Sequence, residues 1–328
     1  MKAAFYERLG PAREVLQIAE VDTPTAGPGQ LLVRLRASGV NPSDVKARAG
    51  ARAGQTRMPF PRIVPHSDGA GDVVAVGAGM TAEWVGRRVW LWNGQWQRPF
   101  GTAAEFVALP PGQVAPLADG ISYEQGACLG IPAMTAHACV FAAGPVSGKT
   151  VLVTGGAGTV GALAIRMAKL SGARVIASVG SDAQGARAVR AGADHLVRHR
   201  SPDMATQIEA AAGSPVEHVV EVEYGANVDA VASVIAPNGT IATYGSAAVP
   251  QPEVPFYSLL FKAVTVRHVL VYILREAERH AAATDINAWL ADGRLVPEIA
   301  HGLPLDEIAQ AHEIVEKGGR AGSVVLTL

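Results

Sequence analysis

Short runs of alternating apolar and polar residues fill the first third of the chain, and proline and glycine separate them. Alternation with a period of two is typical of β-strands whose two faces meet different surroundings. The runs follow one another evenly and few stretches have helical spacing, which favours a small antiparallel barrel or barrel-like sheet. The predicted strands cover residues 3–5, 15–20, 30–38, 71–76, 88–90 and 103–108.

The pattern changes near Ser122, where strands and helices begin to alternate. A helix is predicted over 123–139, an apolar strand follows at 150–154, and the alternation continues to a helix over 276–292. Such alternation builds a parallel sheet that helices cover on both faces. Between these elements the pattern predicts strands at 174–178, 195–197, 218–222, 240–244 and 264–269, and helices at 161–171, 182–191 and 204–212.

The last residues, 295–328, end in a predicted strand over 323–328, and we expect this tail to pack back onto the N-terminal domain. The sequence therefore predicts an α/β protein with two domains. A barrel-like domain would comprise residues 1–121 and 295–328, and a doubly wound domain residues 122–294. A length of 328 residues agrees with two domains.

Composition excludes several classes of function. A net charge of −1 argues against nucleic acid or an anionic membrane surface as the main partner. Cys128 and Cys139 are too few for a disulfide framework or a Cys-rich zinc site, and they favour a reducing compartment. The first residues lack the apolar core of a signal peptide and no run is long enough to span a membrane, so we expect a cytoplasmic protein.

A Gly-x-Gly-x-x-Gly motif stands at Gly156, Gly158 and Gly161, directly after the apolar strand at 150–154 and at the start of a helix. This context is typical of a dinucleotide site. We expect Gly156 to permit the tight turn, Gly158 to let the pyrophosphate approach the backbone, and Gly161 to allow close helix packing. The backbone amides of Thr159 and Val160 would face the phosphates.

The end of the second strand favours NADPH over NADH. NAD enzymes place an acid there, about 20 residues after the motif, to bind the ribose hydroxyls, whereas this chain has Ser178, Val179, Gly180 and Ser181. Asp182 is better explained as a first-turn residue of the next helix, with Ser181 as the N-cap. The third strand ends in cations that either bind a 2′-phosphate or form a solvated charged surface: Arg198, His199 and Arg200.

These motifs, with several others, resemble those of the zinc-free medium-chain dehydrogenases/reductases, in particular the NADPH:quinone oxidoreductase and zeta-crystallin group. The resemblance covers nearly the whole chain, and it implies a GroES-like barrel domain that carries a Rossmann domain. The segments that carry it are 39–44 (GVNPSD), 65–71 (PHSDGAG), 130–136 (GIPAMTA), the glycine motif and 244–246 (YGS).

The same resemblance speaks against zinc. Where zinc-dependent alcohol dehydrogenases carry their catalytic ligands, this chain has Asn41, Ser67 and, approximately, Ile131, and none of them is a plausible zinc ligand. The four-cysteine structural zinc lobe is also absent. His66 and Asp68 have no further ligands near them in the sequence and are interpreted as turn residues.

By resemblance, the NADPH contacts of the family fall on positions spread along the chain. Leu270 and Val271 are equally compatible with the role of core residues. Many relatives have a tyrosine five residues after the asparagine, and this chain has Lys46, which either binds an anion or faces solvent. The implied contacts are Asn41, Thr135, Gly158, Thr159, Val160, Gly180, Ser181, His199, Asn227, Tyr244, Gly245, Ser246, Val269, Leu270 and Val271.

With neither a metal nor an evident acid–base pair, an acceptor that is already electron-poor is expected. We predict hydride transfer from NADPH to a quinone, with Asn41 and Lys46 orienting the acceptor and water supplying protons. Reduction of 2-alkenals or enones, and an NADPH-binding protein without catalysis, remain the alternatives. A short-chain dehydrogenase is rejected because no tyrosine has a lysine four positions later.

Two further segments have open interpretations. Residues 90–100 contain three tryptophans and form either an aromatic lid over a quinone or a surface hairpin. The apolar segment 264–271 is expected at the edge of the parallel sheet, where it would pair across a two-fold axis. The sequence thus predicts a homodimer or homotetramer.

Overall fold

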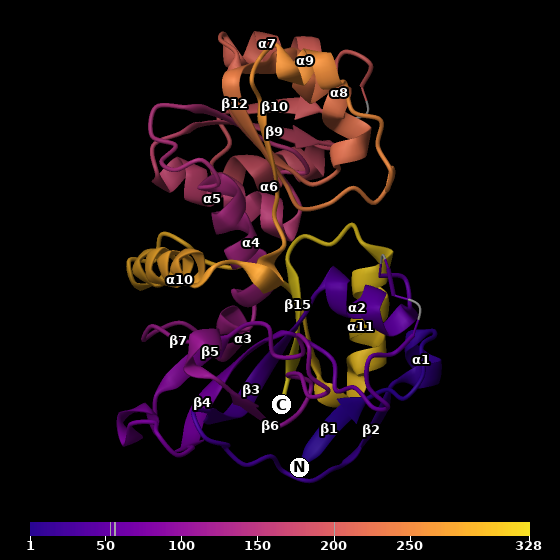
Figure 1. Ribbon diagram of the computed structural model, residues 1–328, viewed down its shortest axis with the longest axis vertical. Helices are drawn as coiled ribbons and strands as arrows, with labels where there is room; N and C mark the ends of the chain where they lie inside the picture. Colours follow the sequence, from indigo (N-terminus) through magenta and orange to yellow (C-terminus); the bar gives the residue numbers. More distant parts are fainter. Residues whose placement is uncertain (53, 56, 200) are drawn as a thin grey trace. The chain divides into compact units, whose positions relative to one another are not determined.

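The computed structural model describes residues 1–52, 54–55, 57–199 and 201–328, which form two compact units (Figure 1). The outer unit contains Met1–Pro132 and Ala283–Leu328, and the central unit contains Ala133–Ala282. The domain limits expected at 121/122 and 294/295 remain a prediction.

The outer unit is built on a largely antiparallel sheet with the strand order β14-β15-β3-β4-β5-β7, and β6 pairs with β3. In β3, Leu31, Val33 and Leu35 are buried while Arg34 and Arg36 are exposed, so the predicted alternation places one face on the core. A separate pair joins β1 and β2. The strands are β1 (Lys2–Phe5), β2 (Gln17–Glu20), β3 (Leu31–Val40), β4 (Asp68–Val76), β5 (Arg88–Leu91), β6 (Phe106–Leu109), β7 (Val114–Pro116), β14 (Ile299–Pro304) and β15 (Ser323–Thr327).

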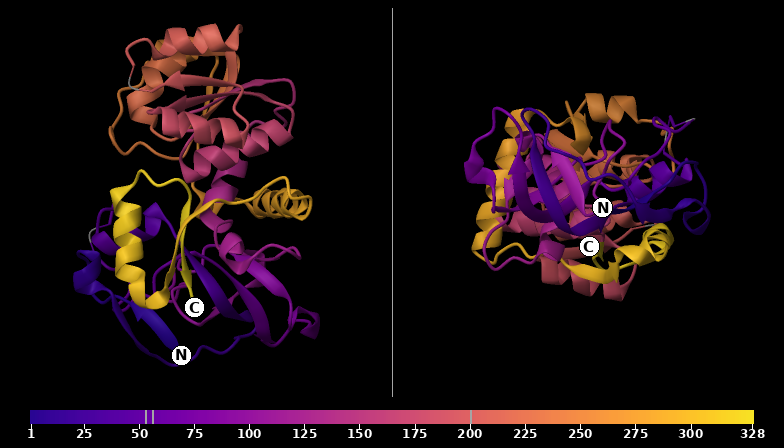
Figure 2. Two further views of the ribbon diagram at one scale, coloured as in Figure 1. Left: turned by 180° about the vertical axis from the view of Figure 1, so that it is seen from behind. Right: turned by 90° about the horizontal axis from the view of Figure 1, so that it is seen from below.

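The C-terminal tail completes this sheet, because β15 pairs antiparallel with β3. This pairing confirms that the tail packs on the N-terminal strands. α11 lies along β15 (Figure 2). It buries residues that are spaced for one helical face: Ile308, Ala311, His312 and Val315. The helices of this unit are α1 (Ala12–Val15), α2 (Pro42–Ala49), α3 (Tyr123–Gly126) and α11 (Ile308–Lys317), with short 3-10 turns at Ala82–Trp84, Pro111–Gln113 and Leu305–Glu307.

The central unit contains a parallel sheet with the order β10-β9-β8-β11-β12-β13. Counted from β8, this is the order 3-2-1-4-5-6 of a dinucleotide-binding sheet. All four residues of β8 are buried, as a strand covered on both faces requires. The strands are β8 (Thr150–Val153), β9 (Arg174–Val179), β10 (His195–Arg198), β11 (Val216–Glu221), β12 (Ile235–Thr243) and β13 (Thr265–His268).

Three of the helices that connect these strands were predicted: Thr159–Leu170, Asp182–Ala191 and Met204–Ala212. The helices Tyr224–Val234 and Phe256–Leu260 were not predicted. Each boundary between the two units falls within a helix, α4 or α10. The remaining helices belong to the central unit. The bounds are α4 (Gly130–Val140), α5 (Thr159–Leu170), α6 (Asp182–Ala191), α7 (Met204–Ala212), α8 (Tyr224–Val234), α9 (Phe256–Leu260) and α10 (Glu276–Ala291), with a 3-10 turn at Val271–Ile273.

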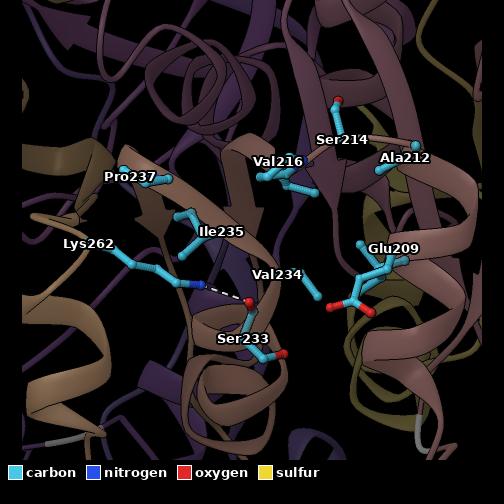
Figure 3. A pocket seen from close by; sticks show the side chains of 12 residues that line it. Glu209, Ala212, Ser214, Val216, Ser233, Val234, Ile235, Pro237 and Lys262 are labelled. Atoms are coloured by element: carbon cyan, nitrogen blue, oxygen red, sulfur yellow. Dashed lines mark hydrogen bonds between the residues drawn. The ribbon is translucent and has the colours of Figure 1, made fainter.

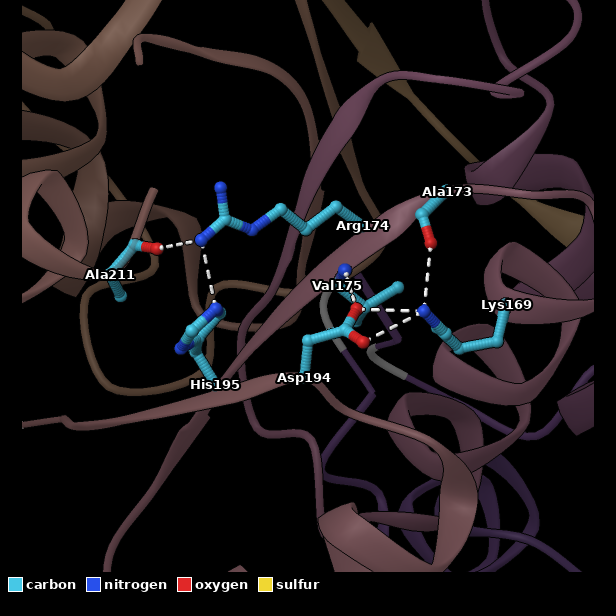
Figure 4. A network of polar contacts seen from close by, with 7 residues as sticks. All are labelled: Lys169, Ala173, Arg174, Val175, Asp194, His195 and Ala211. Carbon is cyan, nitrogen blue, oxygen red and sulfur yellow. Dashed lines mark hydrogen bonds and ion pairs between the residues drawn. The ribbon is translucent and has the colours of Figure 1, made fainter. Parts of the chain in front are cut away.

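A polar network holds four elements of this unit together, at the starts of two strands and the ends of two helices (Figure 4). Lys169 of α5 donates to both oxygens of Asp194, at 2.9 and 2.8 Å, and Asp194 also accepts from the amide of Val175 at 2.7 Å. Arg174 lies 2.9 Å from His195 and donates to the carbonyl of Ala211 at 2.8 Å. These contacts pin the starts of β9 and β10 to the ends of α5 and α7.

One predicted helix is wrong in its extent. The helix expected over 123–139 is broken into α3 and α4 by a turn at residues 127–129. A Cβ atom at Gly130 would lie 2.1 Å from Oδ1 of Asp68, and the amide of Ile131 donates to that oxygen at 2.8 Å. A continuous helix would use this amide internally, so the break makes it available to a buried carboxyl group. The strand expected at 264–269 is shorter, 265–268, and lies at the predicted edge of the sheet.

Candidate active site

The turn after β8 shows what each glycine of the motif does. Gly155 has a φ of +61°, so the left-handed position falls one residue before the motif and not at Gly156 as expected. Gly156 is needed for packing, because a Cβ atom there would lie 2.8 Å from the Cβ of Ala177 in β9. A Cβ atom at Gly161 would lie 2.3 Å from the carbonyl oxygen of Gly155. The close approach expected at Gly161 is therefore an approach of α5 to the turn itself.

Gly158 is exposed, and a Cβ atom there would meet only the carbonyl oxygen of Gly155, at 3.2 Å. It is the N-cap of α5, whose first turn has no side-chain cap. Thr159 and Val160 follow and are half-buried. Backbone amides at an uncapped helix N-terminus, together with the helix dipole, bind anions. Gly158, Thr159 and Val160 therefore fit the pyrophosphate of a dinucleotide.

The end of β9 has the residues that the sequence analysis assigned to NADPH. Ser178 is fully buried and accepts a hydrogen bond from the backbone amide of the glycine turn, at 3.1 Å, so it holds that turn in place. Ser181 is the N-cap of α6 and accepts from the amide of Gln184, as predicted. A Cβ atom at Gly180 would lie 2.7 Å from Nε2 of His199, so glycine lets the imidazole approach the backbone.

Of the three basic residues at the end of β10, the structure describes Arg198 and His199. Arg198 forms an ion pair with Asp182. The carboxylate side chain is 96% exposed and the guanidinium side chain 47%, so water screens the pair and a bound anion competes with it readily. Arg200, the third predicted cation, lies outside the described residues.

A buried carboxyl group that the sequence analysis missed ends β11. Glu221 is 1% exposed, and its Oε1 accepts from the hydroxyl of Thr154 at 2.8 Å and from Nδ2 of Asn227 at 2.9 Å. Burial raises the pKa of Glu221, and these hydrogen bonds oppose the rise. The signal was available, because an acid at the carboxyl end of a central parallel strand lies where such sheets bind ligands.

The residues expected near the ribose and nicotinamide follow β12 and β13. Ser246 accepts a hydrogen bond from the amide of Gly225 at 2.9 Å and donates to the carbonyl of Val249 at 2.5 Å. Beyond β13, Leu270 is 43% exposed between two buried valines. Thr135 is buried in α4. At the carboxyl ends of β12 and β13 the structure thus gathers Tyr244, Gly245, Ser246, Val269, Leu270 and Val271, on the same edge of the parallel sheet as the glycine turn.

In the outer unit, Asn41 lies between two buried carboxyl groups. Its backbone amide donates to Asp44 at 2.8 Å, and its Nδ2 donates to Oδ2 of Asp68 at 2.7 Å. Burial, followed by the nearby charge of Asp44, raises the pKa of Asp68 well above its usual range. Burial also raises the pKa of Asp44, to about 7. Lys46 is exposed on α2, so the structure does not bring it to this cluster.

His66 and Asp68 are core residues, which corrects their interpretation as turn residues. His66 is fully buried, with Nε2 2.9 Å from Nε2 of His312 and Nδ1 2.9 Å from the hydroxyl of Ser38. Burial lowers the pKa of His66 to about 3, so the imidazoles pair as neutral rings. Ser67 is buried beside them. Within the described ranges, no group of three or more His, Cys, Asp or Glu side chains is arranged to hold a metal ion.

In the tryptophan-rich segment, residues 90–100, two of the three tryptophans are core residues and so cannot belong to a lid. Trp90 is 0% and Trp92 3% exposed, and their rings lie 5.1 Å apart in the core of the outer unit. Both residues therefore contribute to the stability of the barrel. Trp96 alone of the three is half-buried.

A cavity in the central unit carries none of the predicted site residues (Figure 3). It is lined by the first residues of β11 and β12, by the end of α7 with Glu209, and by Lys262, whose Nζ donates to the carbonyl of Ser233 at 2.7 Å. These are the amino ends of the strands, whereas a dinucleotide binds at the carboxyl ends. This cavity is therefore not the cofactor site.

Protein-family models match both the barrel-like unit and the dinucleotide-binding unit of the chain. The alcohol dehydrogenase GroES-like domain matches residues 27–119, and the zinc-binding dehydrogenase family matches residues 159–286. The chain belongs to the medium-chain dehydrogenase/reductase family. The predicted fold class, a GroES-like barrel domain with a Rossmann domain, is confirmed.

Individual members of the family match the whole chain. The quinone oxidoreductase of Rattus norvegicus is 28% identical over 98% of this chain and 96% of its own length. A solved mycobacterial quinone oxidoreductase is 28% identical with a TM-score of 0.89, and a mycobacterial structure complexed with NADPH is 27% identical with a TM-score of 0.86. Both alignments cover 100% of each chain.

These likenesses confirm the resemblance to the quinone oxidoreductases, and the chain is an NAD(P)H-dependent oxidoreductase of this dehydrogenase/reductase family. None of the helices in the described part of the chain is both long and apolar enough to cross a bilayer.

Proposed function

We propose that this dehydrogenase/reductase is an NADPH-dependent quinone oxidoreductase that works without zinc in the cytoplasm. The observation that carries the proposal is the start of α5 at Gly158, which is exposed and has no side-chain cap. Next to it, β9 ends without an acidic residue and β10 ends in basic residues. An acid at the end of β9 would repel a 2′-phosphate, and here none stands between Ser178 and Ser181.

When bound, NADPH supplies the hydride and both electrons of the reaction. The amides of Thr159 and Val160 bind the pyrophosphate, which approaches the backbone at Gly158, while Arg198 and His199 bind the 2′-phosphate in competition with Asp182. Gly156 and Ser178 hold the turn that presents these amides. The remaining contacts proposed for the cofactor are Asn41, Thr135, Gly180, Ser181, Asn227, Tyr244, Gly245, Ser246, Val269, Leu270 and Val271; Arg200 is proposed from sequence alone.

A quinone suits this site because its carbonyl groups need no metal to accept a hydride. Asn41 orients the acceptor, whereas Lys46 is exposed on α2 and is given no part in this step. The reduced quinone takes one proton from water after the hydride arrives, and it leaves as the hydroquinone. Asp68 holds the amide of Asn41 in one orientation, which limits the geometries in which an acceptor can bind to it.

The cofactor proposal is tested with purified protein, 1,4-benzoquinone, and NADPH or NADH. We expect NADPH to be oxidised with the higher kcat/KM, and the Arg198→Ala variant to lose roughly tenfold or more of that preference, since hydrogen bonds to charged groups contribute about 1.5–3 kcal/mol. Arg190→Ala is the control, because this exposed arginine of α6 is not among the proposed contacts. An NADH preference in the wild type contradicts the cofactor assignment.

The same assay separates the alternative activities. A higher kcat/KM with 2-alkenals than with quinones would make the protein an enone reductase. Binding of NADPH without oxidation by either class of acceptor would indicate a non-catalytic NADPH-binding protein.

A second copy of the chain is the proposed partner, in a homodimer or homotetramer. The surface that supports this proposal is the α9 patch, a group of large apolar residues that solvent reaches: Phe256 (63% exposed), Tyr257 (67%), Leu260 (51%) and Phe261 (83%). β13, which follows in the sequence, is an edge strand of the parallel sheet. An exposed apolar patch with an unpaired strand edge is typical of a self-association surface.

A further inference from the structure

A cavity of about 510 Å³ lies wholly within the outer unit. Its wall is formed by Tyr6, by the segment that follows α2, and by residues 95–97. The volume is in the range of small-molecule sites, and the rings of Tyr6, Phe60 and Trp96 provide apolar surface for a planar group.

The charged residues of the wall are all cations. Arg52 and Arg57 line the cavity, and the wall contains no aspartate or glutamate among the described residues. The guanidinium carbon of Arg52 lies 5.0 Å from the centre of the Trp96 ring, and this cation–π contact holds the guanidinium group over the face of the ring. Guanidinium groups bind carboxylate, sulfonate and phosphate groups through paired hydrogen bonds. The cavity therefore favours an anion.

A hydrogen-bond acceptor completes the wall. Gln55 donates from Nε2 to the carbonyl of Ala47 at 2.9 Å, which fixes the orientation of its amide because a carbonyl only accepts. The oxygen of that amide is buried and finds no partner in the described part of the chain. A hydroxyl or N–H group of a ligand would satisfy it.

The cavity lies close to the acceptor-orienting residue. Ala47 of α2 lines it, six residues after Asn41, the N-cap of the same helix. At 1.5 Å per residue this separation is about 9 Å along the helix axis, about the length of a bicyclic ring system. Asp44 lies between them in the sequence: it accepts from the backbone amide of Asn41 at 2.8 Å, and its charge, after burial, raises the pKa of Tyr6. A ligand that reaches from this cavity can therefore present its far end to Asn41.

We propose that the cavity selects acceptors that carry an anionic substituent: the preferred substrate is a planar, electron-poor quinone or enone with a carboxylate, sulfonate or phosphate group, which Arg52 and Arg57 bind. The choice of a quinone or enone rests on the proposed function, whereas the preference for an anion rests on the cavity alone.

The test compares 1,4-naphthoquinone-2-sulfonate with 1,4-naphthoquinone in wild type and in the Arg52→Gln/Arg57→Gln double variant. The measured quantity is the ratio of the two kcat/KM values with NADPH. Comparing this ratio between wild type and variant cancels the difference in intrinsic reactivity between the quinones. We expect the double variant to lower this ratio roughly ten- to hundredfold, the equivalent of one charge-assisted hydrogen bond. Arg52→Lys/Arg57→Lys retains both charges and should restore part of the preference.

Arg62→Gln is the matched control. Arg62 pairs with Glu7 at 2.8 Å and stacks on Phe5, and it does not line the cavity. Its removal takes away one positive charge from the same segment and should leave the ratio unchanged. A ratio in the double variant within about twofold of wild type, or an equal fall in Arg62→Gln, overturns the proposal.

Calorimetric titration with 2-naphthoate distinguishes failure of the cavity from failure of the proposed function, since this compound accepts no hydride. Binding that the double variant loses and Arg62→Gln keeps supports the cavity even if neither quinone oxidises NADPH. Turnover of both quinones without any arginine dependence, and no arginine-dependent binding of 2-naphthoate, would leave the proposed function standing and the anion site refuted.

Discussion

Gly158 and Gly161 belong to one motif, but the structure predicts opposite consequences for replacing them with alanine. Gly158 has φ −69° and ψ 165°, a conformation open to any residue, and an added Cβ atom would meet only one carbonyl oxygen at 3.2 Å. Gly158→Ala should therefore change the free energy of unfolding by no more than about 0.5 kcal/mol. The methyl group would instead occupy the space through which a pyrophosphate approaches the amides.

The loss of one charge-assisted hydrogen bond corresponds to about 1.5–3 kcal/mol, so Gly158→Ala should weaken NADPH binding roughly ten- to hundredfold. In Gly161→Ala the Cβ atom would lie 2.3 Å from the oxygen of Gly155, about 1 Å closer than carbon and oxygen normally approach. Overpacking costs about 1–3 kcal/mol and exceeds the roughly 1 kcal/mol that alanine contributes to helix propensity.

We therefore expect Gly161→Ala to lower the Tm by a few degrees, and Gly158→Ala to leave it unchanged while weakening NADPH binding. Differential scanning calorimetry without cofactor measures the first effect, and isothermal titration calorimetry with NADPH measures the second. Wild-type NADPH affinity in Gly158→Ala would refute the placement of the pyrophosphate. An unchanged Tm in Gly161→Ala would refute the packing role.

Two further predictions concern stability and assembly. Hydrogen bonds from Arg275 and Arg267 hold the pKa of Glu278 at about 2, below its usual 4.5, so its stabilising contribution is complete above pH 4.5 and is lost as the pH falls towards 2. Because water screens part of this cluster, Glu278→Gln should lose about 1–2 kcal/mol of unfolding free energy at pH 7 and progressively less as the pH falls. Thermal unfolding of wild type and variant measures this difference, and a difference in stability that grows at low pH contradicts the prediction. Phe261→Glu changes an 83% exposed residue of the α9 patch and should yield monomers, as measured by light scattering after size-exclusion chromatography. Val189→Glu, at an exposed position of α6, is the control and should leave the oligomer intact. An unchanged oligomer in Phe261→Glu would show that the patch is not part of the interface.

Local patterns predicted the strands of the central unit, although they missed the helices α8 and α9 and the buried Glu221. The order of strands around β8 follows from alternating β and α elements, because right-handed crossovers leave few topologies. Ser181 was recognisable as an N-cap from its place before Asp182, and the structure confirms it. The glycine motif was also local, although the left-handed residue proved to be Gly155. Each of these features depends on residues that are close together in the sequence.

The outer unit contains further features that the pattern did not predict. Asp68 is buried by partners 27 and 63 residues away, Asn41 and Ile131, and no local signal announces such contacts. His66 likewise meets His312 across 246 positions, so a short motif with two polar residues was taken for a turn. The break between α3 and α4 has the same origin, since it exists to direct the amide of Ile131 to Asp68. These contacts depend on tertiary structure, which periodicity does not encode.

Two of the buried carboxyl groups, Asp68 and Glu221, have a common role in the proposed sites. Asp68 accepts from Nδ2 of Asn41, and Glu221 accepts from Nδ2 of Asn227, at 2.7 and 2.9 Å. In each contact Nδ2 of the asparagine donates to the carboxyl oxygen, so the contact fixes which end of the asparagine amide faces the protein and directs the amide oxygen the other way. Burying a carboxyl group is unfavourable unless hydrogen bonds compensate, and each of these groups accepts further N–H or O–H groups. In both units, then, a missed acid explains why a predicted asparagine has one orientation.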